Sequence, residues 1–293
     1  MDGSGRLGVS LTERLLQRGY TVHVATHNQG ELQGLKRVFG ENNNKRVKLF
    51  RWDPFDYTSI IDAMKGCSGL FYTFEPLQDQ QPSYDEFAAE VEVRTAHNVL
   101  EACAQTETIA RVVFTSSITA VVWRENRNST ADVDERHWSD PNFCRKYKLW
   151  HALAKTVSEK TAWALAMDRG VDMVSVNAGL VMGQQLGPSS PYLKGAAEMY
   201  EEGTLVAVDL KFLVDAHVCA YECASAYGRY LCFNHVINSP ADALNLARVL
   251  SPDGTPSPTS SGDLRLSKQK IQNKKLNKLM VEISSGEIMS AAH

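Results

Sequence analysis

The sequence predicts an α/β fold in which a doubly wound parallel sheet carries helices on both faces. Short apolar runs alternate with helical patterns over residues 1–177, which is typical of repeated βαβ units. A glycine-rich loop opens the first helical pattern, as it does in many sheets of this kind. The 293 residues and a hydrophobic fraction of 43% supply enough apolar surface for a large buried core.

The elements of the first half follow from their periodicity. Leu7, Leu11 and Leu15 define a helical stripe that ends at Gly19, a residue type common at helix C-termini. Short β-rich runs then predict strands, and longer amphipathic patterns predict helices. The strands are expected at 20–26, 46–52, 69–73, 111–115 and 172–176, and the helices at about 30–39, 59–65, 84–105 and 150–169.

The pattern becomes irregular after Asn177. Helical segments are expected near 192–202 and 214–226, and a Ser/Pro/Gly stretch at 251–262 predicts a surface loop. The lysines of the segment 267–281 alternate with apolar residues. We interpret them as the solvated face of a terminal amphipathic helix rather than as a nucleic-acid patch.

Composition excludes several classes of protein. The net charge of −3 provides no field that would attract nucleic acid or an anionic membrane. No stretch approaches 18 continuous apolar residues, and the N-terminus lacks the pattern of a secretory signal. The six cysteines are scattered, which favours reduced thiols over a zinc site or disulfides. We therefore expect a cytoplasmic protein that binds no metal, nucleic acid or membrane.

A G-x-G-x-x-G string lies immediately before the first helix. Its glycines are Gly3, Gly5 and Gly8. Glycines let the backbone approach a diphosphate, and the N–H groups at a helix N-terminus attract the negative charge. The string predicts a Rossmann-type dinucleotide site, with an ordinary loop at a helix start as the alternative. Such a string normally follows a strand, whereas here the sequence starts at the loop.

Two residues after predicted strands are candidates for cofactor selection. His27 follows the strand at 20–26, where an Arg would suit a ribose 2′-phosphate and an Asp a free diol, so the choice between NADP and NAD stays open. Asp53 closes the next strand and could accept a hydrogen bond from adenine. A plain Asp-Pro turn is the alternative for Asp53.

A serine and a lysine suggest a reactive site. Ser117 ends a buried strand, at the edge where open α/β sheets bind ligands. His151 and Lys155 are four residues apart in a predicted helix and therefore share a face. A solvated surface lysine is the alternative when Lys155 is considered alone.

Several motifs together resemble the extended short-chain dehydrogenase/reductases, and within them the plant cinnamoyl-CoA reductases and dihydroflavonol reductases. After the glycine loop and the T-S-S at a strand end come D-E-x-x-W-S-D (134–140), W-x-x-x-x-K-x-x-x-E (150–159) and V-N-x-G-L-V-x-G (176–183). The resemblance spans about residues 1–283. It implies NADPH-dependent reduction of a thioester or ketone of the phenylpropanoid type.

The resemblance also implies site residues. In that family a Ser positions the carbonyl, a Tyr donates its proton, and a Lys lowers the pKa of the Tyr and binds the nicotinamide ribose. These positions correspond here to Ser117, His151 and Lys155, so a histidine replaces the tyrosine. Phe74 occupies a small-residue position that faces the cofactor in the family.

The replacement leaves two functions open. A neighbouring Lys155 cation should lower the pKa of His151, so its ring should be mostly neutral at cytosolic pH. The first hypothesis is an NAD(P)H-dependent reductase of a small aromatic substrate, in which His151 or a water relays the proton. The second is an inactive dinucleotide-binding protein that serves regulation or partner binding. The sequence leaves the oligomeric state open.

The same resemblance divides the chain into three parts. A dinucleotide-binding core is expected over 1–177, a mainly substrate-binding region interleaved with late core elements over 178–283, and a tail over 284–293. The strand that should precede the glycine loop is missing, so we suspect a shortened chain. We expect a gap, or strained pairing, between the strands that begin near Tyr20 and Gly69. Low solubility and weak nucleotide binding should follow, because buried main-chain groups without partners cost roughly 1–3 kcal/mol each.

Overall fold

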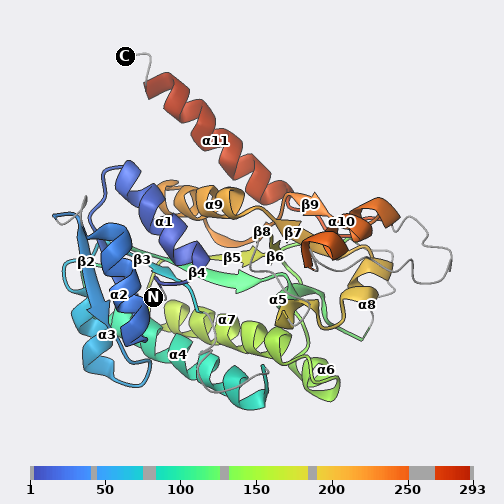
Figure 1. The fold of residues 1–293 in the computed structure, drawn as a ribbon, viewed down its shortest axis with the longest axis horizontal. Helices are drawn as coiled ribbons and strands as arrows, with labels where there is room; N and C mark the ends of the chain where they lie inside the picture. Colours follow the sequence, from blue (N-terminus) through green and yellow to red (C-terminus); the bar gives the residue numbers. More distant parts are fainter. Residues whose placement is uncertain are drawn as a thin grey trace.

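The computed structural model describes residues 3–40, 45–74, 84–125, 132–183, 190–250 and 268–290, with side chains described up to residue 282. Parallel strands lie in the middle of the molecule and helices pack on both faces (Figure 1). The predicted α/β, doubly wound architecture is therefore confirmed.

The parallel strands form two separate sheets. One contains β1 (Val22–Thr26) and β2 (Val47–Arg51). The other has the order β3-β4-β5-β8 and contains β3 (Gly69–Tyr72), β4 (Arg111–Ser117), β5 (Met173–Ala178) and β8 (Gly228–Cys232). A third, mixed sheet of short strands has the order β6-β7-β9 and contains β6 (Leu180–Val181), β7 (Val206–Val208) and β9 (His235–Val236).

The two parallel sheets do not join. β1 and β3 each turn an edge toward the other sheet, and no strand among the described residues pairs with either edge. This is the gap that the sequence predicts.

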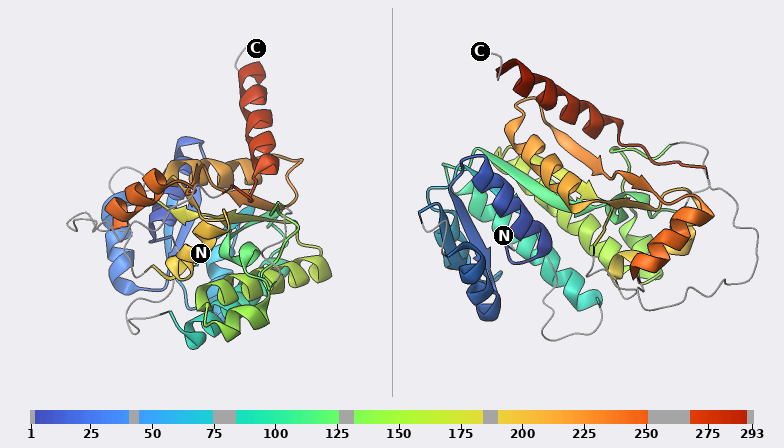
Figure 2. Two further views of the ribbon diagram at one scale, coloured as in Figure 1. Left: turned by 90° about the vertical axis from the view of Figure 1, so that its right-hand side faces the viewer. Right: turned by 45° about the horizontal axis from the view of Figure 1, so that its top comes forward.

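Helices cover both faces of the parallel sheets, as shared apolar clusters show. On one face lie α1 (Arg6–Gln17), α2 (Gln29–Phe39) and α9 (Leu210–Glu222). On the other lie α3 (Tyr57–Met64), α4 (Glu86–Ala104) and α7 (Trp150–Arg169). The last helix, α11 (Lys274–Ser290), packs on α9 through its first turns and then extends outward (Figure 2).

Local sequence explains where these helices begin and end. The side chains of Asn28, Asp56 and Asp85 cap the N-termini of α2, α3 and α4 by accepting main-chain N–H bonds. Helix α7 ends at Gly170, whose φ of 69° is left-handed and favours glycine.

The centre of the larger sheet is apolar on both sides. Val112, Val113, Val174 and Val176 from β4 and β5 are completely buried. Continuous rather than alternating apolar runs are typical of parallel strands covered on both faces. Because β4 and β5 are parallel, their C-terminal ends lie at the same edge of the sheet.

Some predicted boundaries are wrong. The helix expected near 192–202 is divided into a 3₁₀ turn (Pro191–Leu193) and α8 (Ala196–Glu201). Between them Gly195 has a φ of 86°, and a Cβ there would lie 2.4 Å from the Trp123 ring. The terminal helix begins at Lys274 rather than near residue 267, because Ile271 first forms a β-bridge with Val133.

Three helices of the described residues were not predicted from the sequence, and one predicted loop falls on residues that the structure does not describe. The helices are α5 (Thr119–Val122), α6 (Pro141–Lys146) and α10 (Pro240–Leu250). The loop expected at 251–262 lies outside the described residues.

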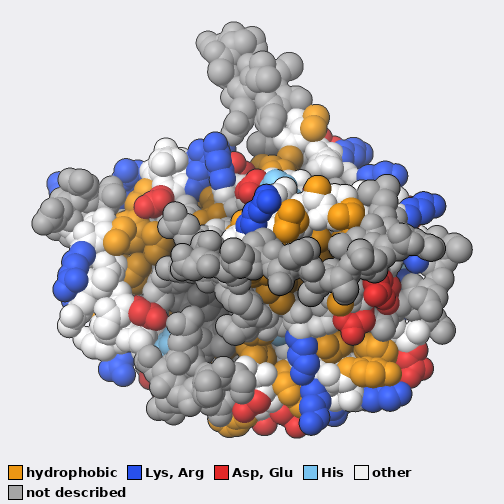
Figure 3. All heavy atoms as spheres, turned by 45° about the vertical axis from the view of Figure 1, so that its right-hand side comes forward, with side chains coloured by type: hydrophobic (Ala, Val, Ile, Leu, Met, Phe, Trp, Pro, Cys, Tyr) orange, Lys and Arg blue, Asp and Glu red, His pale blue; other side chains and the backbone are white. Residues whose placement is uncertain are grey.

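Basic and acidic side chains are interspersed over the face drawn in Figure 3. All six cysteines are free thiols. Within the described ranges, no helix combines the length and apolarity needed to cross a bilayer.

Candidate active site

Ser117 and His151 are linked through Thr119. Thr119 lies at the start of α5, just beyond the end of β4, and its main-chain N–H and hydroxyl both donate to Ser117 Oγ, at 3.2 and 3.0 Å. The same Thr119 hydroxyl lies 3.1 Å from Nδ1 of His151. Thr119 was not predicted from the sequence, although a further hydroxyl two residues after Ser117 was a visible signal.

The direction of these bonds assigns the tautomer of His151. A threonine hydroxyl has one proton, and here it is donated to Ser117. Thr119 must then accept from His151, so Nδ1 carries a hydrogen. In a neutral imidazole the other nitrogen, Nε2, is then an acceptor.

The environment of His151 keeps its ring neutral. Desolvation by the surrounding protein, and secondarily the Lys155 cation, lowers the pKa of His151 to about 3. The predicted direction is confirmed, but burial and not Lys155 is the larger cause. The ring also makes edge contacts with Tyr84 and Tyr192, at centroid distances of 5.7 and 6.2 Å.

Lys155 forms an ion pair with a buried carboxylate, which balances its positive charge. Its Nζ lies 2.8 Å from Oε1 of Glu92, whose residue is only 1% exposed. Lys155 also donates to the carbonyl of Phe74, at 3.4 Å. Tyr84 donates its hydroxyl to the other oxygen of Glu92. Burial, followed by the Glu92 charge, holds the pKa of Tyr84 well above its usual range, so this phenol is a poor acid.

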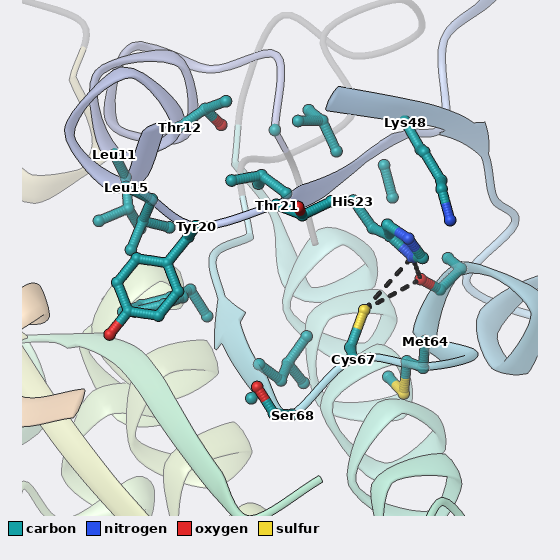
Figure 4. A pocket seen from close by; sticks show the side chains of 18 of the residues that line it. Leu11, Thr12, Leu15, Tyr20, Thr21, His23, Lys48, Met64, Cys67 and Ser68 are labelled. Carbon is teal, nitrogen blue, oxygen red and sulfur yellow. Dashed lines mark hydrogen bonds between the residues drawn. The ribbon is translucent and has the colours of Figure 1, made fainter. Parts of the chain in front are cut away.

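The glycine loop fits the diphosphate of a dinucleotide. Gly5 is the N-cap of α1 and provides no side-chain cap, so the helix N-terminus presents main-chain groups. Gly3 donates its N–H to Ala25 O at 2.8 Å, and a Cβ on it would lie 2.2 Å from Val24 Cγ1. Gly8 lies inside the first turns of α1. Both Gly3 and Gly8 line the cavity between β1 and β3, which Figure 4 shows from close by.

Arg6 adds a cation to this loop, and sequence reasoning missed it. Its guanidinium donates to Met182 O at 2.7 Å and lies over Gly183, where a Cβ would be 1.8 Å from Nη2. Arg6 stands between the second and third glycines of the string, so its position was the available signal. A guanidinium in the first turn of α1 suits a diphosphate.

The carboxylate of Glu31, in the first turn of α2, contacts Thr26, the last residue of β1. Glu31 accepts hydrogen bonds from Ser4 Oγ at 2.6 Å and Thr26 Oγ1 at 2.7 Å. An acidic residue about 20 positions beyond the glycine loop is the usual partner of a free ribose 2′-hydroxyl. Sequence reasoning considered His27 and overlooked Glu31.

Asp53 organises the turn that follows β2. Its Oδ1 accepts from the N–H of Phe55 at 2.8 Å, and its own N–H donates to Ser59 Oγ at 2.9 Å. The turn role given as the alternative is therefore present, and adenine binding by Asp53 stays a prediction.

The structure brings the predicted residues together in two groups. Ser117, His151, Lys155 and Phe74 meet where β4 ends beside α7. Gly3 and Gly5 lie between the end of β1 and the start of α1, with His27 following β1. Ligands of open parallel sheets bind at the C-terminal ends of the strands, where both groups lie.

The sequence matches one protein family and is similar to several reductases. The 3-beta hydroxysteroid dehydrogenase/isomerase family matches residues 1–176. The chain is 36% identical over 285 residues to cinnamoyl-CoA reductase 1 of Petunia hybrida, which covers 94% of this chain and 84% of that protein. It is 31% identical over 245 residues to tetraketide alpha-pyrone reductase 2 of Arabidopsis thaliana, covering 80% and 76%.

Solved structures share the fold. Vestitone reductase from alfalfa superposes with a TM-score of 0.71 at 23% identity, covering 95% of this chain and 90% of that one. A yeast methylglyoxal/isovaleraldehyde reductase complexed with NADPH has a TM-score of 0.71 at 18% identity, covering 95% and 91%.

Proposed function

This chain belongs to the 3-beta hydroxysteroid dehydrogenase/isomerase family, and from that premise we propose that it is an NAD(P)H-dependent reductase of an aromatic thioester or carbonyl compound of the phenylpropanoid type. The single observation that carries the proposal is the hydrogen-bond chain from His151 through Thr119 to Ser117. Its relatives are named as cinnamoyl-CoA and pyrone reductases, and the yeast reductase with the same fold holds NADPH. We also propose a cytoplasmic location.

The cofactor has residues to hold it. The N-terminus of α1 and Arg6 would hold the diphosphate, and Lys155 would lie toward the nicotinamide ribose. When bound, the nicotinamide supplies the hydride for the carbonyl carbon. The reduction also needs a proton for the carbonyl oxygen, and this proton has to come from the residues of the site.

The proton follows the hydrogen-bond chain. Ser117 Oγ accepts from Thr119, so its own proton is available to the carbonyl oxygen of the substrate. As Ser117 gives up that proton it takes the proton of Thr119, and Thr119 takes the proton on Nδ1 of His151. Solvent returns a proton at Nε2. His151 stays neutral before and after the transfer, in agreement with its low pKa.

The experiment begins with fluorescence titration of the protein with NADPH and NADH, followed by a panel of cinnamoyl thioesters and aromatic ketones. We expect cofactor binding and slow turnover of at least one substrate. Thr119→Val should reduce that turnover at least tenfold without changing cofactor affinity, since proton transfer contributes about 10²–10⁴-fold to such reactions.

Thr156→Val is the matched control for Thr119→Val. Thr156 is a buried threonine of α7 whose hydroxyl donates to the carbonyl of Ala152, outside the proton path. Equal losses in the two variants would contradict the relay. Cofactor binding with no turnover of any substrate would contradict the reductase.

A second function, dinucleotide binding without turnover, is favoured by the ion pair of Lys155 with Glu92. A buried carboxylate at 2.8 Å reduces the positive potential that Lys155 offers to a ribose or to a proton donor. In this case the titration shows binding and the substrate panel shows nothing.

A further inference from the structure

A buried carboxylate on α7 ties that helix to the strand ends beside Ser117. Glu159 is completely buried and follows His151 by two helical turns. Its Oε2 accepts from Ser116 Oγ and from Asn177 Nδ2, both at 2.7 Å. Asn177 Nδ2 also donates to the carbonyl of Ser117 at 3.3 Å. The carboxylate therefore holds α7, β4 and β5 together next to Ser117.

Arg229 of β8 pairs with this carboxylate and connects it to a further segment of the chain. Its Nε lies 2.8 Å from Oε1 of Glu159, and its Nη1 donates to the main-chain carbonyls of Glu135 and His137. The guanidinium also stacks on the ring of Trp138, with Cζ 3.6 Å from the centroid. The D-E-x-x-W-S-D motif is thus fastened to Glu159 through Arg229.

The same motif holds the middle of the hydrogen-bond chain. Ser139 is 1% exposed, and its hydroxyl donates to the carbonyl of Thr119 at 2.7 Å. The hydroxyl also accepts from the main-chain N–H of Trp123 at 2.9 Å, and the N–H of Ser139 donates to Ala120 O at 2.9 Å. Helix α5, which begins at Thr119, is therefore fixed at both ends by Ser139.

Stability alone does not account for an ion pair in this place. Removing two charges from water is costly, and apolar side chains of similar volume often replace a buried ion pair without loss of stability. Hydrogen bonds have directions, however, and these bonds determine where His151, Thr119 and Ser117 lie relative to one another. Proton transfer depends on such placement, since a displacement of about 1 Å can reduce a rate about 100-fold.

We propose that Glu159 and Ser139 are positioning residues of the proton relay, an inference that rests on the reductase function proposed above. Glu159 fixes Ser117 relative to His151, because it anchors both the helix and the strand ends. Ser139 fixes Thr119 between them. Neither residue gives or takes a proton in the transfer. Together they keep the Thr119 hydroxyl directed at Ser117, so that Nδ1 of His151 keeps its hydrogen.

The first experiment reads the tautomer of His151 and does not depend on turnover. In protein labelled with ¹⁵N-histidine, the side-chain nitrogen resonances distinguish Nδ1–H from Nε2–H, and the variant His151→Gln identifies the signals of this residue. We expect the unmodified chain to hold the Nδ1–H form. Ser139→Ala and Glu159→Gln should each raise the population of the Nε2–H form about tenfold, the equivalent of about one lost hydrogen bond.

Thr95→Val is the matched control for Ser139→Ala. Thr95 is a completely buried residue of α4 whose hydroxyl donates to Val91 O at 2.7 Å, so this variant also loses one buried hydroxyl. The tautomer of His151 should not change in it. An unchanged tautomer in both Ser139→Ala and Glu159→Gln, or an equal change in Thr95→Val, would overturn the proposal. If Glu159→Gln does not fold, Ser139→Ala decides, since it loses a single hydroxyl.

The second experiment is a double-mutant cycle in kcat at saturating cofactor. Because Ser139 acts through Thr119, Ser139→Ala should lower kcat about tenfold in the unmodified chain and have no further effect in Thr119→Val. The dissociation constant of NADPH should stay the same in all four proteins. A general structural loss would instead multiply with the effect of Thr119→Val, which would overturn the positioning role and leave the reductase intact. No turnover in the unmodified chain would overturn the reductase, and the relay with it.

Discussion

At the residue scale, the proton chemistry of the site depends on which nitrogen of His151 carries hydrogen. Thr119 donates to Ser117 and therefore accepts from Nδ1, which leaves Nε2 as an acceptor. A neutral imidazole in this tautomer cannot replace a tyrosine by direct donation from Nε2, but it can pass a proton along a chain of hydroxyls. The substitution thus changes the route of the proton while Ser117 and Lys155 remain in place.

Restoring a tyrosine at this position should raise activity. We predict that His151→Tyr increases the reduction rate of an aromatic carbonyl about tenfold or more, because a positioned phenol beside Lys155 is a direct general acid. Steady-state kinetics with saturating cofactor measure the effect. In this variant Thr119→Val should no longer matter. An unchanged rate in a variant that binds cofactor would show that the pocket, and not proton donation, limits turnover.

Cofactor preference should depend on Glu31. His27 alone predicts only weak discrimination between NADPH and NADH, since an imidazole lacks the two-pronged guanidinium that an Arg would offer to a phosphate. Glu31 adds a negative charge close to Thr26 and Ser4, where it opposes a ribose 2′-phosphate. We predict that Glu31→Ala lowers the dissociation constant of NADPH about fivefold, equivalent to about 1 kcal/mol of removed repulsion. Fluorescence titration measures it, and an equal gain for NADH would argue against a selective role.

At the element scale, long amphipathic segments are predictable from sequence and short or interrupted ones are not. The stripe of Leu7, Leu11 and Leu15 repeats for three turns and predicts α1 within one or two residues. Helix α5 has four residues, too few for any period to emerge. The division at Gly195 depends on its contact with Trp123, which is 72 positions away and leaves no local signal.

In the candidate site too, contacts between residues far apart in the chain are the part that the sequence does not predict. Ser117, His151 and Lys155 are identifiable because they stand in local motifs at a strand end and on a helix face. Glu92 approaches Lys155 only through the packing of α4 against α7. Tyr84, which precedes α4, joins the pair through its hydrogen bond to Glu92. No spacing within a single element predicts contacts of this kind.

The buried ion pair between α4 and α7 should affect stability strongly. We predict that Glu92→Leu lowers the free energy of unfolding by roughly 3–5 kcal/mol, because it leaves the Lys155 charge buried and unpaired. Lys155→Met should cost a similar amount, and the double variant should recover most of the loss. Urea unfolding of the four proteins measures the coupling. Strictly additive losses would show that the two charges do not interact.

The contact between α9 and β4 should make the protein acid-sensitive. His217 is completely buried, with Nδ1 bonded to Leu213 O and Nε2 to Thr115 Oγ1, and burial lowers its pKa to about 4. A histidine whose folded pKa lies below the unfolded value of about 6.5 binds its proton preferentially when unfolded. Its contribution to stability is therefore complete above pH 6.5 and is lost as pH falls toward 4.

A comparison of two pH values measures this effect. Between pH 7 and pH 4 the His217 contribution should fall by about 3 kcal/mol. The variant His217→Gln can keep one donor and one acceptor but does not titrate, so it should lose correspondingly less stability over this range. Carboxylates titrate equally in both proteins and cancel. Identical pH dependence in the two proteins would contradict the assignment of the shift to His217.

At the scale of the whole molecule, the separation of the two parallel sheets connects stability with nucleotide binding. Ala25 on β1 accepts from the N–H of Gly3, while Gly3 and Gly8 both line the cavity between β1 and β3. The loop expected to bind the diphosphate therefore borders the cavity on one side. Whatever fills the gap fixes the glycine loop at the same time, so strand occupancy and nucleotide binding should be positively coupled.

Filling the gap between β1 and β3 should therefore raise stability and cofactor affinity together. Fusing six to ten β-forming residues ahead of Met1 should place a strand between β1 and β3 and supply ladder partners to both edges. Each buried main-chain group that gains a partner is worth roughly 1–3 kcal/mol, a large share of a total stability of about 5–15 kcal/mol. We therefore expect higher solubility, a sharper and later thermal transition, and a dissociation constant for dinucleotide at least tenfold lower than in the chain without the fusion. A fusion with proline at alternate positions is the control. If the unfused chain already proves fully soluble, melts cooperatively and binds dinucleotide tightly, the gap has no energetic consequence and the coupling is refuted.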